Sequence, residues 1–171
     1  MKKGVLVAAA AIFLIGSVIA VGVLKYGIVP VNADVPPSAL EMRIFPAALR
    51  ASVARHAGEQ PAPAPSSDEN LIAGAEVYRE MCARCHGLPG KGPSVLGSSF
   101  YPPAPQLALH PTEYTEAEIF WIVKHGIRNT GMPAWAKLLS DEDISQVVAM
   151  VRRLDSPPPA AEAALREHSD E

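Results

Sequence analysis

The sequence predicts an all-α protein in which a small helical domain is carried by a single N-terminal membrane-spanning helix. A run of 21 uncharged, mostly apolar residues extends from Gly4 to Leu24. A helix of that length crosses a bilayer core roughly 30 Å thick. Further along, apolar residues recur at helical spacing behind Ser or Thr residues that are followed three positions later by an acidic residue, which is typical of capped amphipathic helices. The length of 171 residues favours one folded domain with additional segments.

The apolar run has two interpretations. We favour an uncleaved anchor at residues 1–25, because the run exceeds the roughly 7–15 residues of a signal-peptide core. The alternative is a signal peptide cleaved after Ala33, although the run ends nine residues before that position. Lys2 and Lys3 precede the run, and positive residues tend to stay on the cytoplasmic side. We therefore expect a single-pass protein of the cytoplasmic (inner) membrane, with the rest of the chain in the periplasm.

Charge is distributed unevenly along the chain, whose net charge is −3. Residues 1–65 carry six Lys and Arg against three acidic residues, whereas residues 66–171 carry nine against fifteen. An acidic outer part argues against nucleic acid as a partner and favours a positively charged protein surface.

Residues 26–57 are expected to form a short helical, membrane-proximal segment. Ser38 with Glu41 forms a capping box that opens a helix. Pro46 interrupts the helical pattern, so we expect two short helices. A helix in the membrane interface, a helix docked on a partner subunit and a loosely helical spacer all remain open. His56 is expected to be a solvent-exposed residue.

A Pro/Ala-rich linker, residues 58–68, follows this segment. Its alternating prolines favour the polyproline conformation at about 3 Å per residue, which would hold the next domain tens of Å from the anchor region. The domain itself is expected at residues 69–155, with a first helix capped by Ser66. Residues 156–171 are expected to form a polar, mobile tail.

The chain's only two cysteines, Cys82 and Cys85, are separated by two residues and followed directly by His86. This arrangement is typical of c-type haem attachment, in which each thiol adds to one vinyl group of the porphyrin and the next residue places an imidazole under the iron. A thioredoxin-like redox pair would require a surrounding βαβ pattern, which is missing from the sequence. A zinc site would require a second ligand pair at finger spacing.

A second axial ligand must come from elsewhere in the chain, because cytochromes c usually bind iron through His and Met. Met132 lies 46 residues after His86. Its neighbours Gly131 and Pro133 form a turn that can aim its side chain. Met150 is the competing residue, but it lies in an apolar helical run and is interpreted as core packing. We therefore predict Met132 as the second ligand.

Residues 70–154, about half of the chain, resemble a bacterial class I cytochrome c domain. The residues that carry the resemblance are Gly74, Tyr78, the attachment sequence 82–86, Gly87, the 90–92 turn, the 131–135 loop and the final run 139–154. The family usually places an aromatic residue of the last helix against the first helix, whereas this chain has Met150 or Val151 there.

The resemblance implies one haem c, bound covalently through two thioethers at Cys82 and Cys85, with His86 and Met132 as iron ligands. It also implies that a backbone carbonyl, expected near residues 102–105, accepts a hydrogen bond from the other ring nitrogen of His86. Trp135 either donates its ring nitrogen toward a haem propionate or packs in the core. Because the family acquires haem outside the cytoplasmic membrane, the haem domain is expected in the periplasm.

Two further helices are expected in the domain. One opens at Thr115. Within it, Phe120 and Trp121 are interpreted as core or haem-contacting residues, and His125 as a cation near the helix C-terminus. The last helix opens at Ser140 and closes the domain.

Two axial protein ligands leave no open position on the iron. The expected function is therefore reversible one-electron transfer, with no small-molecule substrate, and the chain is not expected to be an enzyme itself. One interpretation is a tethered carrier between respiratory redox proteins, with a quinol-oxidising complex, terminal oxidase, reductase or dehydrogenase as partners. A second is a stably bound electron-entry subunit of one membrane redox complex. A haem-based gas or redox sensor is a distant third, because a sensor normally carries an output domain.

Overall fold

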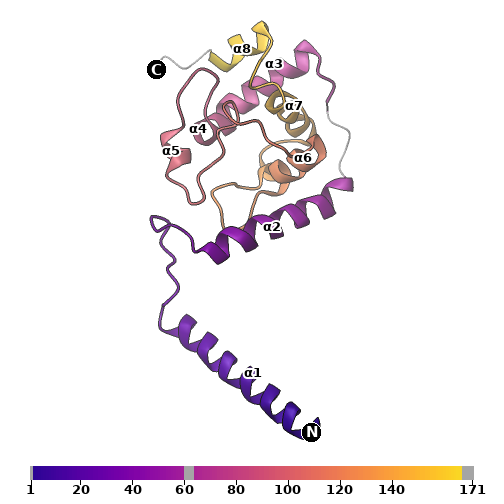
Figure 1. Cartoon of the computed structure of the whole chain (residues 1–171). Helices are drawn as coiled ribbons and strands as arrows, with labels where there is room; N and C mark the ends of the chain where they lie inside the picture. The colour runs from indigo at the N-terminus through magenta and orange to yellow at the C-terminus, as the bar shows by residue number, and fades with distance from the viewer. Residues whose placement is uncertain (1, 60–63, 167–171) are drawn as a thin grey trace. The chain divides into compact units, whose positions relative to one another are not determined.

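A computed structural model describes residues 2–59 and 64–166 (Figure 1). All regular secondary structure in these residues is helical, and no strand occurs among them, which confirms the predicted all-α class. The chain divides into two compact units, one ending at Val35 and the other beginning at Pro36.

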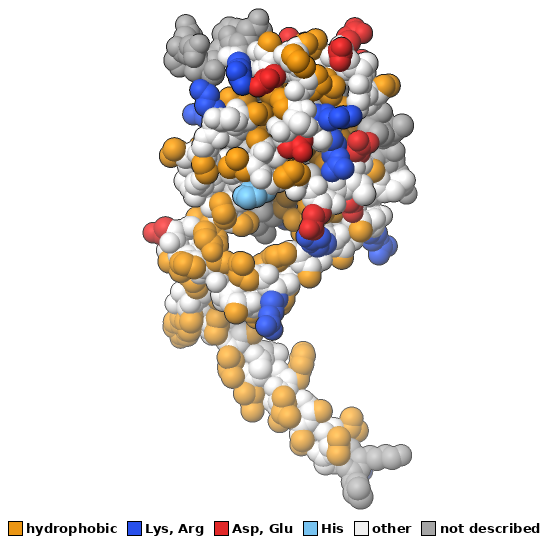
Figure 2. Space-filling model, turned by 45° about the horizontal axis from the view of Figure 1, so that its top comes forward, with side chains coloured by type: hydrophobic (Ala, Val, Ile, Leu, Met, Phe, Trp, Pro, Cys, Tyr) orange, Lys and Arg blue, Asp and Glu red, His pale blue; other side chains and the backbone are white. Residues whose placement is uncertain are grey.

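The first unit contains one long helix, α1 (Lys2–Lys25). Its most apolar stretch, within Lys3–Lys25, has a mean hydropathy of 2.7, and none of that stretch is buried in the protein. Figure 2 shows hydrophobic side chains along this helix, whereas positive and negative side chains intermingle on the visible face of the second unit. By length and composition, α1 can cross a membrane.

The second unit begins with an uninterrupted helix, α2 (Ala39–His56), and its short 3-10 extension η1 (Ala57–Glu59). The predicted capping box is present, because the Ser38 hydroxyl accepts from the Glu41 N–H and the Glu41 carboxylate accepts from the Ser38 N–H. The prediction of two short helices is wrong, since α2 continues through Pro46. The alanine-rich residues that follow favour helix, and packing of the C-terminal half offsets the missing proline N–H.

The C-terminal half of α2 packs on helix α6 (Glu116–His125) of the domain. Val53 and Ala57 are buried there, and the Arg50 guanidinium lies 3.2 Å from the Glu113 carboxylate. The segment on the N-terminal side of the predicted linker 58–68 therefore touches the domain directly, while the predicted separation of the domain from the anchor region stays a prediction. Residues 60–63 of the linker lie outside the described residues.

An aromatic stack forms part of the same contact. The His56 ring stacks on the Trp121 indole at a centroid distance of 5.7 Å, and the His125 ring lies 5.1 Å from the same indole. His56 is exposed, as predicted, but it also touches the domain. Trp121 thus belongs to the α2–α6 contact, whereas Phe120 lies in the core.

The domain core lies where the first and last helices of the predicted domain cross (Figure 1). Its elements are α3 (Asp68–Val77), the π turn η2 (Tyr78–Cys82), α4 (Ala83–His86), α5 (Val95–Ser98), α6, the 3-10 turn η3 (Trp135–Lys137), α7 (Asp141–Val151) and α8 (Pro159–Arg166). Helix α3 packs on α7 and α8, and α6 packs on the other side of α7.

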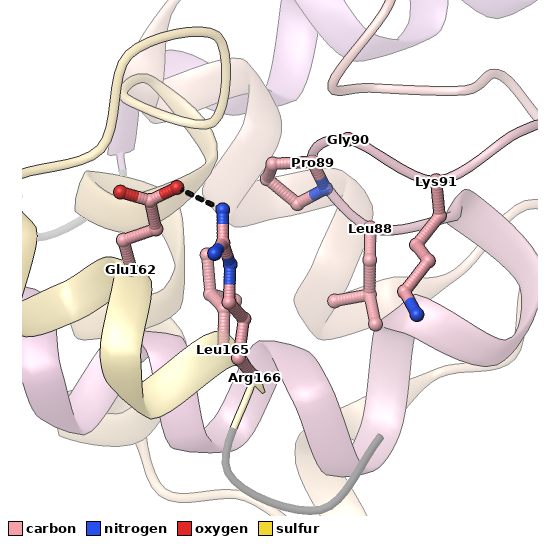
Figure 3. A pocket seen from close by; sticks show the side chains of 7 residues that line it. All are labelled: Leu88, Pro89, Gly90, Lys91, Glu162, Leu165 and Arg166. Carbon is pink, nitrogen blue, oxygen red and sulfur yellow. Dashed lines mark hydrogen bonds and ion pairs between the residues drawn. The ribbon is translucent and has the colours of Figure 1, made fainter. Parts of the chain in front are cut away.

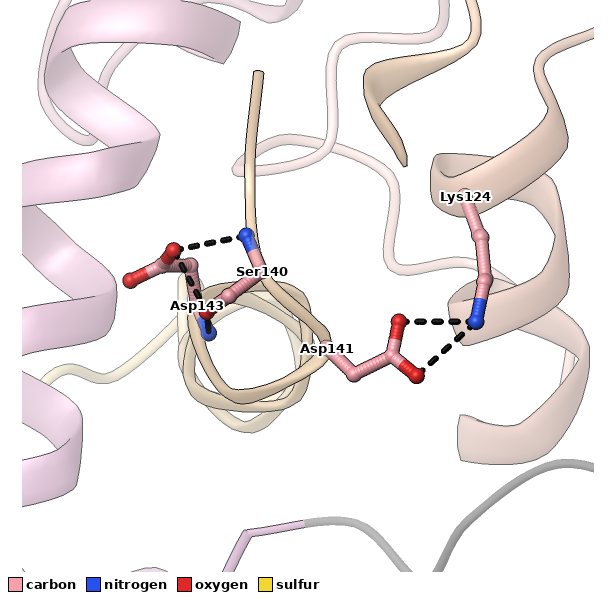
Figure 4. Close-up of polar contacts among 4 residues, drawn as sticks. All are labelled: Lys124, Ser140, Asp141 and Asp143. Atoms are coloured by element: carbon pink, nitrogen blue, oxygen red, sulfur yellow. Dashed lines mark hydrogen bonds and ion pairs between the residues drawn. The ribbon is translucent and has the colours of Figure 1, made fainter. Parts of the chain in front are cut away.

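The caps follow the sequence closely. Thr115 and Ser140 accept capping bonds as predicted, and Figure 4 shows the Ser140–Asp143 box at the start of α7. Beside it, the Lys124 ammonium on α6 lies 2.7 Å from the Asp141 carboxylate and so joins the two helices. The first cap is one residue off, because Ser67 and not Ser66 accepts from the Asn70 N–H.

The interpretation of residues 156–171 as a mobile tail is wrong for Pro159–Arg166, which form helix α8. Ala161, Ala164 and Leu165 lie at helical spacing and are buried against α3, and the Arg79 guanidinium donates to the Ala164 carbonyl at 2.5 Å. A pocket of about 410 Å³ separates this helix from residues 88–91, with the Glu162–Arg166 ion pair in its lining (Figure 3). The sequence did not predict this helix, because its buried face consists mainly of small alanine side chains, which give only a weak hydrophobic pattern.

The close approach of α3 and α7 depends on Gly74. A Cβ built there would lie 2.2 Å from the Gln146 carbonyl oxygen and 3.1 Å from the Met150 Cβ. Met150 is fully buried beside it, which confirms its interpretation as a core residue in the place where the family usually has an aromatic side chain.

Replacement of Gly74 by Ala is expected to lower the free energy of unfolding by about 1–3 kcal/mol, because the added methyl group forces two helix backbones apart. Denaturant unfolding of the haem-loaded protein, followed by far-UV circular dichroism, measures the change. Gly92→Ala is the matched control, since a Cβ at Gly92 meets nothing within 4 Å. Equal losses in the two variants would contradict the packing account.

Candidate functional site

The attachment sequence lies at the end of the first domain helix. After α3, the backbone widens into the π turn η2, in which the Ala83 N–H donates to the Tyr78 carbonyl, and α4 then carries the chain to His86. Single π turns in helices are frequent at functional sites. Cys82 and Cys85 are free and half-buried on either side of this junction. The sequence pattern contains no signal for the π turn.

The electrostatic setting of Cys82 is unlike that of a reactive thiol. Burial, followed by the neighbouring charge of Cys85, raises the pKa of Cys82 to about 12. In thioredoxin-like pairs the pKa of the reactive thiol is lowered, because the thiolate is the nucleophile. The thioredoxin-like alternative to haem attachment therefore loses support.

The His86 imidazole is oriented by one backbone carbonyl. Its Nδ1 lies 2.9 Å from the Pro105 oxygen, at the end of the predicted range 102–105. A carbonyl can only accept, so Nδ1 carries the proton and Nε2 keeps a free lone pair. Burial lowers the pKa of His86, and the bond to Pro105 opposes that shift. The neutral imidazole is the form that binds a metal.

Met132 lies in the loop between α6 and α7, and its backbone is held at both polar atoms. Its N–H donates to the Thr130 Oγ1 at 3.1 Å, and its carbonyl accepts from the Ile127 N–H at 3.1 Å. The Thr130 hydroxyl in turn donates to the Ile127 carbonyl at 2.8 Å. Gly131 lies against the Phe100 ring, since a Cβ there would come within 2.8 Å of it. The Met132 side chain is partly buried against the core.

The predicted site residues therefore come from two places. Cys82, Cys85 and His86 share one helix end, whereas Met132 and Trp135 share the α6–α7 loop. Cys82, Met132 and Trp135 all pack against the same core cluster. Two thiols, one imidazole with a free Nε2 and one thioether form a donor set that fits a haem of the c type. Among the described residues, no group of three or more His, Cys, Asp and Glu side chains could hold a bare metal ion.

One residue of the site was missed by the sequence reasoning. Gln106, directly after Pro105, bonds through its side chain to Cys85, Ser94 and Ala104. A glutamine after proline carries no recognisable pattern, so only the structure identifies it.

Residues 69–151 match the family model described as cytochrome C oxidase, cbb3-type, subunit III. This part of the chain is a c-type cytochrome domain, and its cofactor is accordingly haem c. The match confirms the fold class and the family resemblance that the attachment sequence predicted.

Two curated relatives give a more particular similarity. The chain is 33% identical over 96 residues to the cbb3-type cytochrome c oxidase subunit FixP of Sinorhizobium medicae (strain WSM419), and equally to that of Rhizobium meliloti (strain 1021). The matched stretch covers 53% of this chain but only 30% of the length of each relative.

Tyr78 links the first helix to the residue after the attachment sequence. Its side chain is fully buried, and its hydroxyl donates to the Gly87 carbonyl at 2.8 Å. Burial raises the pKa of Tyr78 far above its usual value, so the hydroxyl remains a donor at any physiological pH.

Tyr78→Phe is expected to lower the free energy of unfolding by about 1–2 kcal/mol, because the Gly87 carbonyl loses its partner. Denaturant titration of the haem-loaded protein measures the loss. Tyr101→Phe serves as the control, since Tyr101 is 39% exposed. Removal of the Tyr101 hydroxyl should change the free energy of unfolding by less than about 0.5 kcal/mol. The interpretation fails if both variants unfold at the same denaturant concentration as the unaltered protein.

Proposed function

We propose that the chain is a membrane-anchored monohaem cytochrome c that delivers single electrons to a terminal oxidase as a stably bound subunit. The observation that carries the proposal is the attachment sequence, with its oriented His86, inside a segment that matches the cbb3-type subunit III model. The curated relatives are named as subunits of cbb3-type oxidases, which favours the bound subunit over the free carrier.

Each site residue has a defined role in this proposal. The Cys82 and Cys85 thiols would hold the haem through thioether links, and the His86 Nε2 and the Met132 sulfur would bind its iron. Trp135 is proposed to donate its ring nitrogen toward a propionate. A haem held by these residues would supply reversible one-electron chemistry. The chain's residues bind, orient and shield it from water.

The membrane-proximal helix α2 is docked on the haem domain. Val53 and Ala57 are buried against the domain, and the His56 ring stacks on Trp121. We therefore propose that α2 and the domain move together as one body. We further propose that α1 remains in the membrane, with its N-terminus in the cytoplasm and the haem domain in the periplasm.

Replacement of Met132 by Ala tests the second ligand. A methionine–iron bond gives ferric cytochromes a weak absorption band in the far red, and a thioether ligand raises the reduction potential. The variant is expected to lose that band, to have a lower potential and to bind carbon monoxide. Absorption spectroscopy and a redox titration measure these changes.

The matched control is Met150→Leu, because Met150 is fully buried in α7. This nearly volume-conserving change should keep the band and cost less than about 1.5 kcal/mol of stability. If Met150→Leu abolishes the band, or if the unaltered protein already binds carbon monoxide readily, the assignment of Met132 is wrong. Carbon monoxide binding by the unaltered protein would also reopen the sensor interpretation.

Purification of the chain in mild detergent tests its assembly. The bound-subunit proposal predicts that the haem c of this chain elutes with a terminal oxidase, and that the same fraction consumes oxygen when an artificial electron donor reduces it. A Met132→Ala chain should elute in the same position with slower oxygen consumption, since assembly does not require the second ligand. Elution of the unaltered chain alone, in a form that still exchanges electrons with an added oxidase, would favour the tethered carrier.

A further inference from the structure

We propose that Gln106 is a positioning residue whose side-chain amide holds the Pro105 carbonyl against the His86 imidazole and so controls how strongly His86 donates to the haem iron. The inference rests on the proposed ligation of iron by His86. It goes beyond that ligation, because Gln106 would control the strength of the His86 ligand without hydrogen bonding to the His86 ring or the Met132 sulfur.

The Gln106 side chain joins three segments of the chain. Its Nε2 donates to the Cys85 carbonyl at 3.2 Å and to the Ala104 carbonyl at 2.9 Å, and its Oε1 accepts from the Ser94 N–H at 2.8 Å. Cys85 precedes His86, and Ala104 precedes Pro105. One amide nitrogen thus bridges the peptide group that precedes His86 and the peptide group that precedes Pro105.

Pro105 depends on this bridge more than another residue would. Proline has no N–H, so it cannot fix its own peptide by donating a hydrogen bond. Its position is set by its neighbours, because the Ala104 N–H donates to the Gly97 carbonyl at 2.9 Å and the Gln106 carbonyl accepts from the N–H groups of Leu109 and His110. The side chain of Gln106 is the element that ties these neighbours to the attachment sequence.

Two glycines keep the space that the amide occupies. A Cβ at Gly87 would lie 2.7 Å from the Gln106 Oε1, and Gly87 has a φ of +76°. A Cβ at Gly97 would lie 1.9 Å from the Cys85 oxygen and 3.2 Å from the Gln106 Nε2. The amide is therefore packed tightly between α4 and α5, and its partly buried bonds fix a single orientation.

The consequence for the ligand follows from general metal chemistry. A hydrogen bond from the non-ligating ring nitrogen fixes the orientation of the imidazole and raises its basicity. A more basic imidazole stabilises ferric iron. Loss of the Gln106 amide should lengthen the His86–Pro105 bond, weaken this donation and raise the reduction potential. Disturbance of Met132 would shift the potential in the opposite direction, since a thioether ligand raises it.

Gln106→Met tests the proposal in the full-length, haem-loaded chain in detergent. Methionine keeps the length of the side chain and removes all three hydrogen bonds of the Gln106 amide. Two readouts are compared with the unaltered chain: the reduction potential and, by proton NMR of the reduced protein, the exchange rate of the His86 Nδ1 proton. We expect a higher reduction potential. We also expect the His86 Nδ1 proton to exchange faster by about fivefold to tenfold, because weakening the His86–Pro105 bond costs roughly the free energy of one hydrogen bond. The far-red methionine band should remain.

Ser94→Ala is the matched control. It removes the Ser94 hydroxyl, which donates to the Arg84 carbonyl at 2.5 Å and accepts from the Gly97 N–H at 2.9 Å, but it leaves the Ser94 N–H and all contacts of Pro105. This variant should lose stability in the same loop while its potential and proton exchange stay unchanged. A purely structural role for Gln106 would make the two variants behave alike.

The proposal is overturned if Gln106→Met leaves both readouts unchanged, lowers the potential, or matches Ser94→Ala. If Gln106→Met does not mature, Gln106→Glu carries the test through proton exchange, because it keeps the acceptor for Ser94 and loses the two donated bonds. Unchanged exchange in that variant also overturns the proposal. Failure of the proposed function is a separate result, since it would appear in the unaltered chain as missing covalent haem or a missing far-red band.

Discussion

The hydrogen bond from His86 to the Pro105 carbonyl is the contact on which the rest of the site depends, because it joins the helix that carries the attachment sequence to the loop that wraps around it. It fixes the tautomer of His86 and leaves Nε2 for the iron. The bond is held from both ends: the Tyr78–Gly87 bond fixes the end of α4, and the Gln106 amide fixes the loop. Changes on either side of it reach the ligand without touching the haem.

The helix that carries His86 is in turn placed by the crossing of α3 and α7. That crossing is possible only because Gly74 lets the Gln146 carbonyl approach the α3 backbone. Met150 fills the space beside it, so a flexible thioether packs where the family usually has an aromatic ring. Helix α8 adds a second layer on α3. The α3–α7 crossing thus positions the attachment sequence. Met132 lies in a loop instead, and its backbone is fixed by hydrogen bonds to Thr130 and Ile127.

The parts that could be predicted are those with short-range physical causes. The caps at Ser38, Thr115 and Ser140 follow from local hydrogen bonding, and the all-α class follows from apolar spacing. Features that depend on tertiary packing were missed or wrong. Pro46 does not break α2, because the helix is docked on α6, and the alanine-rich segment of α8 is ordered by burial against α3. Gln106 could not be found, since its role exists only when three distant segments meet.

The covalent state of the haem tests the central claim most directly. The full-length chain, purified from cells that mature c-type cytochromes, is denatured and extracted with acidified organic solvent, and the pyridine haemochrome spectrum of the protein fraction is recorded. The account predicts that the haem stays with the chain, one per polypeptide, and gives the spectrum of a porphyrin with both vinyl groups saturated by Cys82 and Cys85. Haem that passes into the organic phase, or a chain that carries none, would contradict it.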